Sequence, residues 1–351
     1  MTASRSKASA MHALGAGILG VAALAGAGST LAQEGPQRVN VDNFARAETD
    51  LYFARAVKGG AFGQLVHARE PASIENQAVV RMNRDTLYSS GVFDLQAGPV
   101  TLTLPNVGSR FMSLQVINED HFTTEVVYGP GAFTYDRAKV GTRYVLLLVR
   151  TLVDPQQRAD VDAAHQAQGA IRVEQAAVGR FEVPQWDQPS QDKLRNVLKE
   201  LAVFGSQGVM FGSKAEVNPV SHLIGSAMGW GGNPPSAAVY AGAYPARNDG
   251  RTIHRLKVKD VPVDGFWSVT VYNAKGYFEK NELGAYSLNN LTAKPDADGS
   301  ITIQFGGCER ATPNCLPVMA GWNYTVRMYR PRQSIIDGSW KFPEAMPVAA
   351  Q

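Results

Sequence analysis

Residues 81–95 read RMNRDTLYSSGVFDL, in which the polar triplet Asn83-Arg84-Asp85 stands directly before an apolar, β-prone segment. Every second residue is apolar in PVTLTLP (residues 99–105), which is typical of a half-buried strand. RYVLLLVRTL (143–152) is apolar almost throughout, which predicts a strand covered on both faces. The first half of the chain is therefore predicted to be a β domain, with the triplet at the mouth of one strand.

Helical patterns surround this block, and a second strand-rich block follows them. The apolar spacing predicts helices over residues 42–58, 154–169, 189–205 (with Ser190 as N-cap) and 219–230. After Gly229 the strand-like segments are TIHRLKV, FWSVTVYN, SITIQF and WNYTVRMYR. Two strand-rich blocks without regular strand–helix alternation predict a mainly β, β-rich α+β fold. The expected architecture is two jelly-roll- or sandwich-like β domains with inserted helices.

The N-terminus has the order of a secretory signal peptide. Arg5 and Lys7 precede a Gly- and Ala-rich apolar run, and Thr30-Leu31-Ala32 resembles a cleavage site. We predict cleavage after Ala32, no stable membrane anchor after that cleavage, and a periplasmic or secreted protein. The predicted division is a signal peptide (1–32), an N-terminal β domain (33–175), a helical or loop connection (176–240) and a C-terminal jelly-roll β domain (241–345).

Composition and motifs exclude several function classes. The formal net charge is +3, and no basic stripe is present, so no nucleic acid is expected as a partner. The sequence has no nucleophile-elbow motif (G-x-S-x-G) and no phosphate-binding loop of the G-x-x-x-x-G-K-[ST] type. Histidines are scattered, and the one local cluster, Glu119-Asp120-His121, is interpreted as a solvated loop. No metal and no cofactor are predicted.

The two cysteines, Cys308 and Cys315, lie in the Gly/Pro-rich segment GGCERATPNCLP. In an exported protein this pattern predicts a disulfide that closes a short loop.

Two long stretches carry a family resemblance. NRDTLYSSGVFDLQAGPVTLTLP with RFMSLQVIN resembles the DUF1254 domain, and DGFWSVTVYNAKGYFEKNELGAYSLNN with LPVMAGWNYTVRMYRPRQSIIDGSW resembles the DUF1214 domain usually found C-terminal to it. GWGGNPPSAAVY (229–240) fits the same pairing. The resemblance implies two jelly-roll-like β domains with added helices, found mainly in bacteria, and no particular reaction. Asn118 stands where many relatives carry Asp.

The polar triplet is the first candidate site. A guanidinium fork binds carboxylates or sugar hydroxyls directionally, so Arg84 and Asp85 are candidates for an orienting cation and an acid/base group. Asp120 is a second acid/base candidate. The alternative interpretation is structural: Arg84 and Asp85 form a buried ion pair or a turn network that caps the strand.

Aromatic and amide side chains are the second candidate set. Rings can stack on sugars and amides can hydrogen-bond them, although aromatic residues at this density are also core material. The candidate ligand-binding residues are Asn83, Tyr88, Trp230, Asn233, Trp267, Tyr272 and Asn273.

We therefore expect an exported pocket protein on a double β scaffold that binds or processes a carbohydrate or another polar small molecule. The alternative is a non-catalytic jelly-roll scaffold that associates with itself. Fold alone does not separate the two, because jelly rolls serve both uses.

Overall fold

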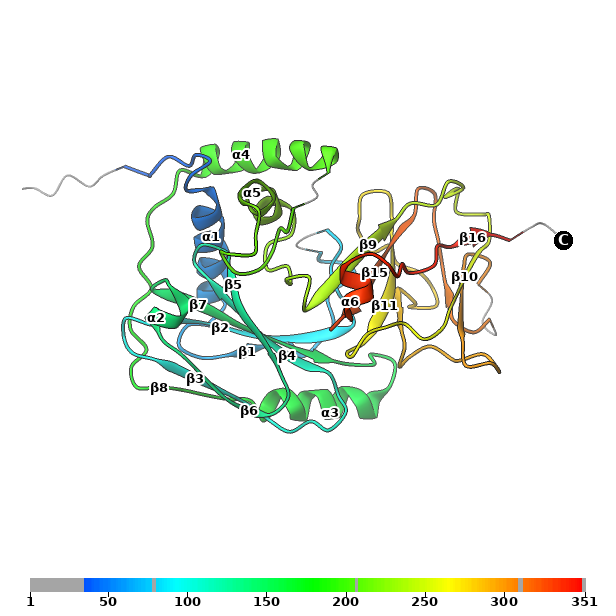
Figure 1. The fold of residues 1–351 in the computed structure, drawn as a ribbon, viewed down its shortest axis with the longest axis horizontal. Coiled ribbons are helices and arrows are strands. Elements are labelled where there is room, and N and C mark those ends of the chain that lie inside the picture. Colours follow the sequence, from blue (N-terminus) through cyan, green and yellow to red (C-terminus); the bar gives the residue numbers. More distant parts are fainter. Residues whose placement is uncertain (1–34, 78–79, 206–207, 309–311, 349–351) are drawn as a thin grey trace, which may run out of the picture. The chain divides into compact units, whose positions relative to one another are not determined.

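The computed structural model describes residues 35–77, 80–205, 208–308 and 312–348, and it contains two β domains joined by a helical segment (Figure 1). The predicted mainly β, α+β fold class is confirmed. The predicted signal peptide, residues 1–32, lies outside the described residues. Within the described ranges, no helix has both the length and the apolar character that a membrane crossing requires.

Four helices occur where the apolar spacing predicts them, and two short helices, at residues 137–140 and 333–336, were not predicted. The helices are α1 (Phe44–Lys58), α2 (Arg137–Val140), α3 (Arg158–Gly169), α4 (Gln188–Leu201), the 3-10 helix η1 (Ala202–Phe204), α5 (Pro219–Met228) and α6 (Gln333–Ile336). The predicted start of α4 is wrong, because its N-cap is Asp187 rather than Ser190. The Asp187 carboxylate accepts a hydrogen bond from the Ser190 N–H at 3.0 Å, as an N-cap side chain does.

The N-terminal domain contains two antiparallel sheets. The larger has the order β1 (Val66–His67), β2 (Thr86–Asp94), β7 (Tyr144–Leu152), β4 (Met112–Asn118), β5 (Thr123–Tyr128), and the smaller β6 (Gly131–Tyr135), β3 (Val100–Leu104), β8 (Arg172–Gln175). Leu102 of β3 and Leu147 of β7 belong to the core cluster that the two sheets share. The alternation in PVTLTLP is explained by this core, since Val100, Leu102 and Leu104 are its buried positions.

The C-terminal domain is a second sandwich. One sheet has the order β14 (Cys315–Leu316), β13 (Ile301–Phe305), β10 (His254–Val258), β16 (Met346–Pro347), and the other β12 (Ser287–Asn289), β11 (Trp267–Tyr272), β15 (Asn323–Tyr329), β9 (Ala238–Ala243). Both sheets contribute to one core, with Ile303 and Phe305 on one side and Val269 and Val326 on the other.

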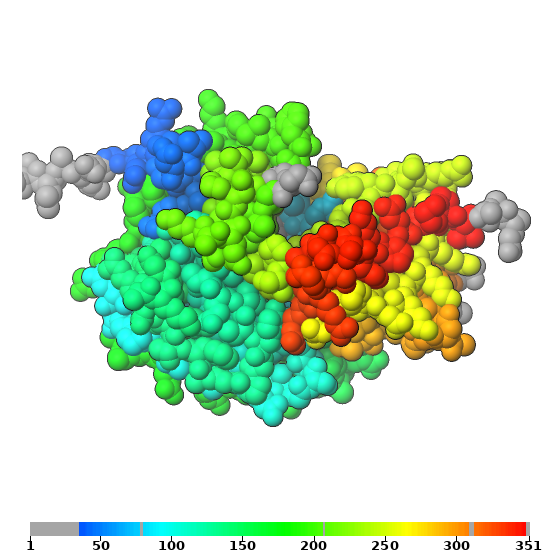
Figure 2. All heavy atoms as spheres, viewed as in Figure 1, coloured from blue at the N-terminus to red at the C-terminus, as the bar shows by residue number. Residues whose placement is uncertain are grey.

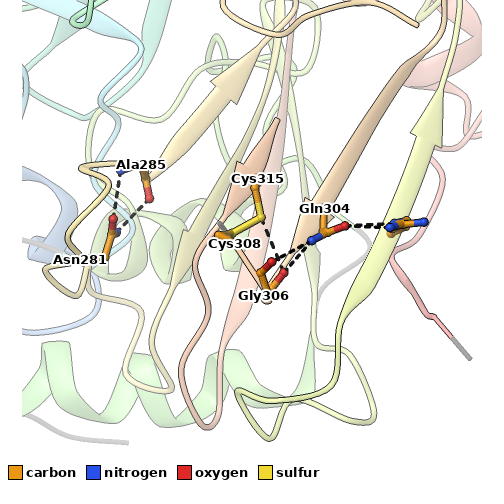
Figure 3. Close-up of a disulfide and its surroundings, with 8 residues drawn as sticks. Asn281, Ala285, Gln304, Gly306, Cys308 and Cys315 are labelled. Carbon is orange, nitrogen blue, oxygen red and sulfur yellow. Dashed lines mark hydrogen bonds between the residues drawn. A yellow bond between two sulfur atoms is a disulfide. The ribbon is translucent and has the colours of Figure 1, made fainter. Parts of the chain in front are cut away.

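A disulfide joins Cys308 and Cys315, as predicted (Figure 3). It links the loop after β13 to β14, which pairs in parallel with β13. The Gln304 side-chain amide holds the same loop by donating to Gly306 O at 3.1 Å and to Gly307 O at 3.2 Å. The disulfide thus fixes the edge strand β14 of the C-terminal sandwich.

Helices α1, α4 and α5 pack together on the side of the larger N-terminal sheet that faces away from its core (Figure 1). Phe53 of α1 is buried against Val92 of β2 and Ile117 of β4. Both faces of this sheet are therefore covered, and this explains the continuous apolar run in β7.

The two β domains share an apolar contact. Phe266 and Tyr329 of the C-terminal domain stack with ring centroids 4.3 Å apart, and Phe111 of the N-terminal domain packs edge-on to Phe266 at 5.0 Å. Leu152 at the end of β7 completes this cluster. The end of β7 is thus fixed against β15, which places the polar residues of these strands near one another.

Candidate functional site

A cavity of about 380 Å³ lies where the two β domains and the helical segment meet. In Figure 2 the surface is hollowed between the green helical segment and the yellow-green residues around β9. The side chains that line the cavity include Arg81, Asn83, Tyr88, Leu148, Arg150, Phe211, Met228, Trp230, Tyr240, Thr325, Arg327 and Tyr329. We name this cavity the junction pocket.

Strand alternation places two arginines in the junction pocket. On β7, Val149 points into the N-terminal core, so the next residue, Arg150, lies on the opposite face. On β15, Val326 points into the C-terminal core, so Arg327 lies on the opposite face in the same way. Their cross-strand partners are tyrosines: Tyr88 lies beside Arg150, and Tyr240 beside Arg327.

Both guanidinium groups are buried and bind neutral acceptors. Arg150 is 5% exposed and donates to the Gln115 Oε1 at 2.6 Å and to the carbonyl of Gly231 at 3.1 Å. Arg327 is 4% exposed and donates to Thr270 Oγ1 at 2.9 Å and to the Tyr272 hydroxyl at 2.7 Å. In the part of the chain that the structure describes, neither has a carboxylate oxygen within 4.0 Å.

Asn83 connects the two domains across the pocket. Its Nδ2 lies 3.1 Å from the Tyr329 hydroxyl and 3.3 Å from the Tyr88 hydroxyl. Burial, followed by the neighbouring tyrosines, raises the pKa of Tyr329 well above its ordinary value. This phenol therefore stays neutral at physiological pH and keeps its proton for donation.

Residues 229–232, here named the GWGG loop, form the wall supplied by the helical segment. Gly231 has φ +79°, a conformation that favours glycine, and its N–H donates to His121 Nε2 at 2.8 Å. A Cβ added at Gly232 would lie 2.4 Å from the Phe211 ring. The glycines therefore serve a tight turn and a close approach of Phe211, and the backbone of the loop faces the pocket.

Trp230 is held in place by contacts on several sides. Its indole N–H donates to Thr49 Oγ1 at 3.1 Å, and its ring stacks on Tyr52 with centroids 4.4 Å apart and on His121 at 5.3 Å. These contacts come from α1 and from the turn after β4, so the tryptophan is fixed before any ligand binds.

The predicted solvated loop at Glu119-Asp120-His121 is wrong for two of its residues. His121 is 2% exposed, because Phe211 and Trp230 pack on its ring. Glu119 is 6% exposed, and its carboxylate accepts the Tyr144 N–H. Burial, followed by His222, lowers the pKa of His121 to about 3. Since Nε2 accepts from Gly231, the neutral ring carries its proton on Nδ1, which lies 2.9 Å from Ser226 Oγ.

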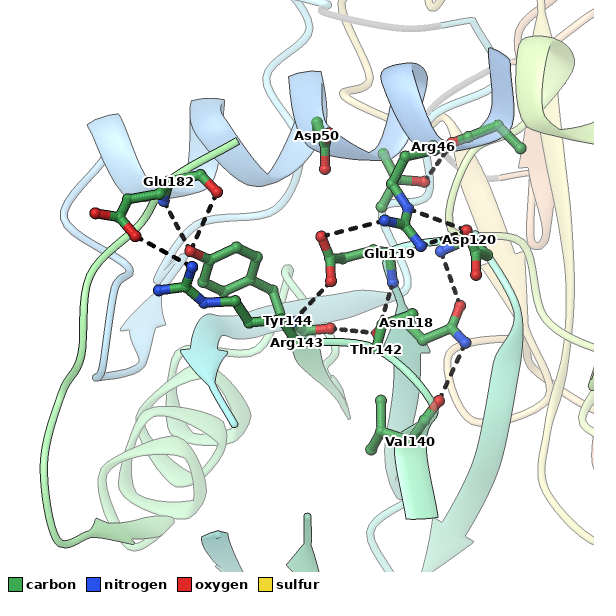
Figure 4. Close-up of polar contacts among 12 residues, drawn as sticks. Arg46, Asp50, Asn118, Glu119, Asp120, Val140, Thr142, Arg143, Tyr144 and Glu182 are labelled. Carbon is green, nitrogen blue, oxygen red and sulfur yellow. Dashed lines mark hydrogen bonds and ion pairs between the residues drawn. The ribbon is translucent and has the colours of Figure 1, made fainter. Parts of the chain in front are cut away.

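The polar side chains of residues 118–120 bind other groups of the protein (Figure 4). Asp120 accepts from Arg46 at 2.6 Å, and the Glu119 carboxylate accepts the Tyr144 N–H at 2.9 Å. Asn118 accepts from the N–H groups of Asp120 and Phe122 and donates to the carbonyl of Val140 at 3.1 Å. An ionised Asp at position 118 has no proton for that last bond.

Arg84 and Asp85 lie outside the junction pocket and do not form an ion pair with each other within 4.0 Å. Asp85 Oδ1 accepts from the Ser287 hydroxyl at 2.7 Å. Arg84 donates to the carbonyl of Ala72, and its guanidinium carbon lies 5.4 Å from the centre of the Tyr286 ring. Both border a small cavity of about 60 Å³. Each residue of the triplet therefore contacts the C-terminal domain, and the triplet is a connector between the domains.

The remaining predicted residues are placed as follows. Asn233 donates to the Tyr240 hydroxyl at 2.8 Å and so positions a pocket residue. Tyr272 lies behind Arg327, donating to the carbonyl of Met82 at 2.7 Å. Trp267 lies in the C-terminal core, and Asn273 accepts from backbone N–H groups in a turn.

The prediction from sequence missed Arg81, Arg150, Arg327, Tyr240 and Tyr329 as pocket residues. A signal was present for two of them, because Arg150 and Arg327 are single charges within otherwise buried strands. A larger cavity of about 720 Å³ is a weaker candidate for a binding site, because its arginine, Arg110, is already paired with Asp160. Among the described residues, no group of three or more His, Cys, Asp or Glu side chains is placed to hold a metal ion.

Fold and pocket together define a two-domain β protein with a polar pocket at the domain junction. Residues 62–175 match the family described as "Protein of unknown function (DUF1254)", and residues 238–333 match "Protein of unknown function (DUF1214)". The chain belongs to the family of proteins that carry these two domains in this order.

Two solved structures are similar to this chain. The VPA0106 protein from Vibrio parahaemolyticus is 19% identical, with a TM-score of 0.68, over 88% of this chain and 97% of that one. An uncharacterised protein from Burkholderia cenocepacia is 14% identical, with a TM-score of 0.49, over 88% and 87% of the two chains. No curated protein matches the chain. The Vibrio structure supports the fold alone.

Proposed function

We propose that this protein is exported and binds a polar small molecule, such as a carbohydrate or an organic acid, in the junction pocket. The observation that supports this proposal is the convergence of guanidinium, phenol and amide groups with a fixed tryptophan on one cavity of about 380 Å³. Concave sites of a few hundred Å³ with a few convergent polar groups are the usual form of small-molecule sites.

Export is supported by the order of residues 1–32 and by the Cys308–Cys315 disulfide, which is a bond of oxidising compartments. We expect the mature chain to begin at Gln33. N-terminal sequencing of the protein from the periplasm or medium tests this, and recovery of residues 1–32 on that material would contradict it.

The binding proposal is tested by a thermal-shift screen of glycans and small acids against the exported protein. A ligand present at 100 times its Kd stabilises the folded state by about 2.7 kcal/mol. The shift should disappear in Tyr240→Ala, which removes a pocket side chain, and persist in Leu291→Ala, which alters the larger cavity. Absence of any shift, or loss of the shift in Leu291→Ala alone, would contradict the proposal.

A further inference from the structure

The junction pocket carries positive charge without a counter-charge. Among the described residues that line it are three arginines, Arg81, Arg150 and Arg327, and no aspartate or glutamate. A guanidinium group does not lose its proton in a protein. Burying such a group without a partner ion is costly, and buried charges are normally paired.

The same chain pairs comparable arginines elsewhere. Arg143 lies 2.9 Å from Asp94, Arg195 lies 2.7 Å from Glu48, and Arg110 binds Asp160. Arg150 and Arg327 are more buried than these and bind only neutral acceptors. The missing partner of the pocket arginines is therefore a feature of this site and not of the protein's arginines in general.

Asp85 is the acid that acts on Arg327, but it does not serve as the counter-ion of the guanidinium group. Asp85 acts electrostatically on Arg327, but its Oδ1 is bound to Ser287, and neither oxygen comes within ion-pair distance of the guanidinium. Asp85 therefore favours the charged form of Arg327 without forming an ion pair with it.

From this we infer that the ligand is a small organic acid whose carboxylate takes the place of the missing counter-ion at Arg150 and Arg327. This inference rests on the proposed function and specifies its ligand. A guanidinium fork matches a carboxylate in shape and charge. The Tyr329 hydroxyl accepts a hydrogen bond from Asn83 Nδ2, and its own O–H remains to donate a hydrogen bond to an anionic oxygen.

The apolar wall indicates what the carboxylate is attached to. Four apolar side chains that line the pocket come from β7 and the helical segment: Leu148, Phe211, Met228 and Trp230. This apolar surface can contact a ring or a short apolar body, but its side chains provide no free hydrogen-bond donor for an inorganic anion. The expected ligand is a compact acid with one strongly polar end.

The test uses matched acid and neutral probes on the exported protein at pH 7: benzoate against benzamide, glucuronate against glucose, and inorganic sulfate. Calorimetric titration should show that at least one organic acid binds more tightly than its neutral partner. The Kd for that acid should weaken about 10- to 100-fold in Arg150→Gln and in Arg327→Gln, as for the loss of hydrogen bonds to a charged group. Added salt should weaken it as well.

Arg143→Gln is the matched control, because it removes an arginine that is paired with Asp94 outside the pocket. It should lower stability and keep the acid affinity. Should a glutamine variant fail to fold, Arg150→Lys and Arg327→Lys keep the charge but not the fork, and the acid should again bind more weakly.

The outcomes separate the inference from the proposed function. Equal affinity for an acid and its neutral partner would overturn the inference and leave pocket binding intact. Acid binding that both arginine variants retain would also overturn it, as would sulfate binding without binding of either organic acid. No binding of any probe, together with an empty thermal-shift screen, would contradict the inference and the proposed function alike.

Discussion

Asp50 is a carboxylate on α1 that is 2% exposed and has one hydrogen-bond donor. The Trp186 indole N–H donates to its Oδ2 at 2.8 Å, and its Oδ1 has no partner among the described residues. Burial raises the pKa of Asp50 from 3.8 to about 7, against the lowering effect of the Trp186 hydrogen bond. Between about pH 4 and pH 7 the folded protein therefore binds more protons at Asp50 than the unfolded chain does.

The free energy of unfolding should consequently decrease as the pH rises through that window. Asp50→Asn should remove this decrease, a difference of at most about 4 kcal/mol across the window at 1.36 kcal/mol per pKa unit. Urea unfolding of both proteins from pH 4 to pH 8 measures it. Asp192→Asn is the control, because the hydrogen bond from Arg195 lowers the pKa of Asp192. Parallel pH profiles for the wild type and Asp50→Asn would contradict the assignment.

Single residues show clearly what the sequence can predict about this site. Arg150 and Arg327 are visible as charges in buried strands, and Asn83 was identified as a candidate from its position before β2. Their meeting at one cavity was not predictable, because it depends on which faces of two separate sheets approach each other. The burial of His121 was not predictable from its neighbours in sequence. The residues that pack on its ring, Phe211 and Trp230, lie about a hundred residues further along the chain.

At the scale of elements, the GWGG loop has little room for an added side chain. Gly232→Ala places a Cβ 2.4 Å from the Phe211 ring, so Phe211 must move into the pocket or the loop must shift. We expect a loss of about 1–3 kcal/mol in stability and a weaker ligand response. Gly242→Ala in β9 is the matched control, since its nearest neighbour, a Tyr244 ring atom, lies 4.0 Å away. Thermal unfolding of the two variants with equal midpoints would show that the close approach is not a constraint.

The Cys308–Cys315 disulfide has a defined expected contribution. The two cysteines are 7 residues apart in sequence, and closing so short a loop in the unfolded chain corresponds to about 2 kcal/mol. Reducing agent should lower the free energy of unfolding by about that amount in the wild type. The double variant Cys308→Ser/Cys315→Ser should already be less stable and should not respond to the reagent. An equal response of both proteins would mean that the reductant acts elsewhere.

Elements were the part of the fold that the sequence predicted best. Period-two alternation located β3 and β11, and the continuous apolar run located β7. Burial of one or both faces of a strand determines which of its consecutive residues are apolar. The start of α4 was misplaced by three residues. Asp187 and Ser190 are both good capping residues, and only the geometry decides which side chain accepts from which N–H.

At the scale of the whole molecule, the cluster of Phe111, Phe266 and Tyr329 couples the two β domains. We expect one cooperative unfolding transition in the wild type. Phe266→Ala should cost about 3–5 kcal/mol and separate that transition into two, because it removes the ring that both domains contact. Phe305→Ala, inside the C-terminal core, should cost a similar amount without weakening the contact between domains. Scanning calorimetry compares them, and two transitions in the wild type would rule out the coupling.

The whole-molecule arrangement was predicted only in part. Two β domains follow from the two strand-rich blocks and from the family resemblance. Their contact was not predicted, because the residues that make it, such as Leu152 and Phe266, have the same apolar character as residues of either core. The polar triplet was the one local sign of the junction, since three polar side chains before a buried strand need partners from elsewhere.

The Asn83–Tyr329 hydrogen bond joins residues 246 positions apart in the chain, and this separation has a kinetic consequence. Contacts of such long range form late in folding, because the entropy of closing the intervening loop opposes them until other structure is present. Binding competence should then appear in the final step of folding, after both sandwiches exist. A ligand in the junction pocket would act chiefly on the reverse step, slowing separation of the domains and so protecting the protein from proteolysis.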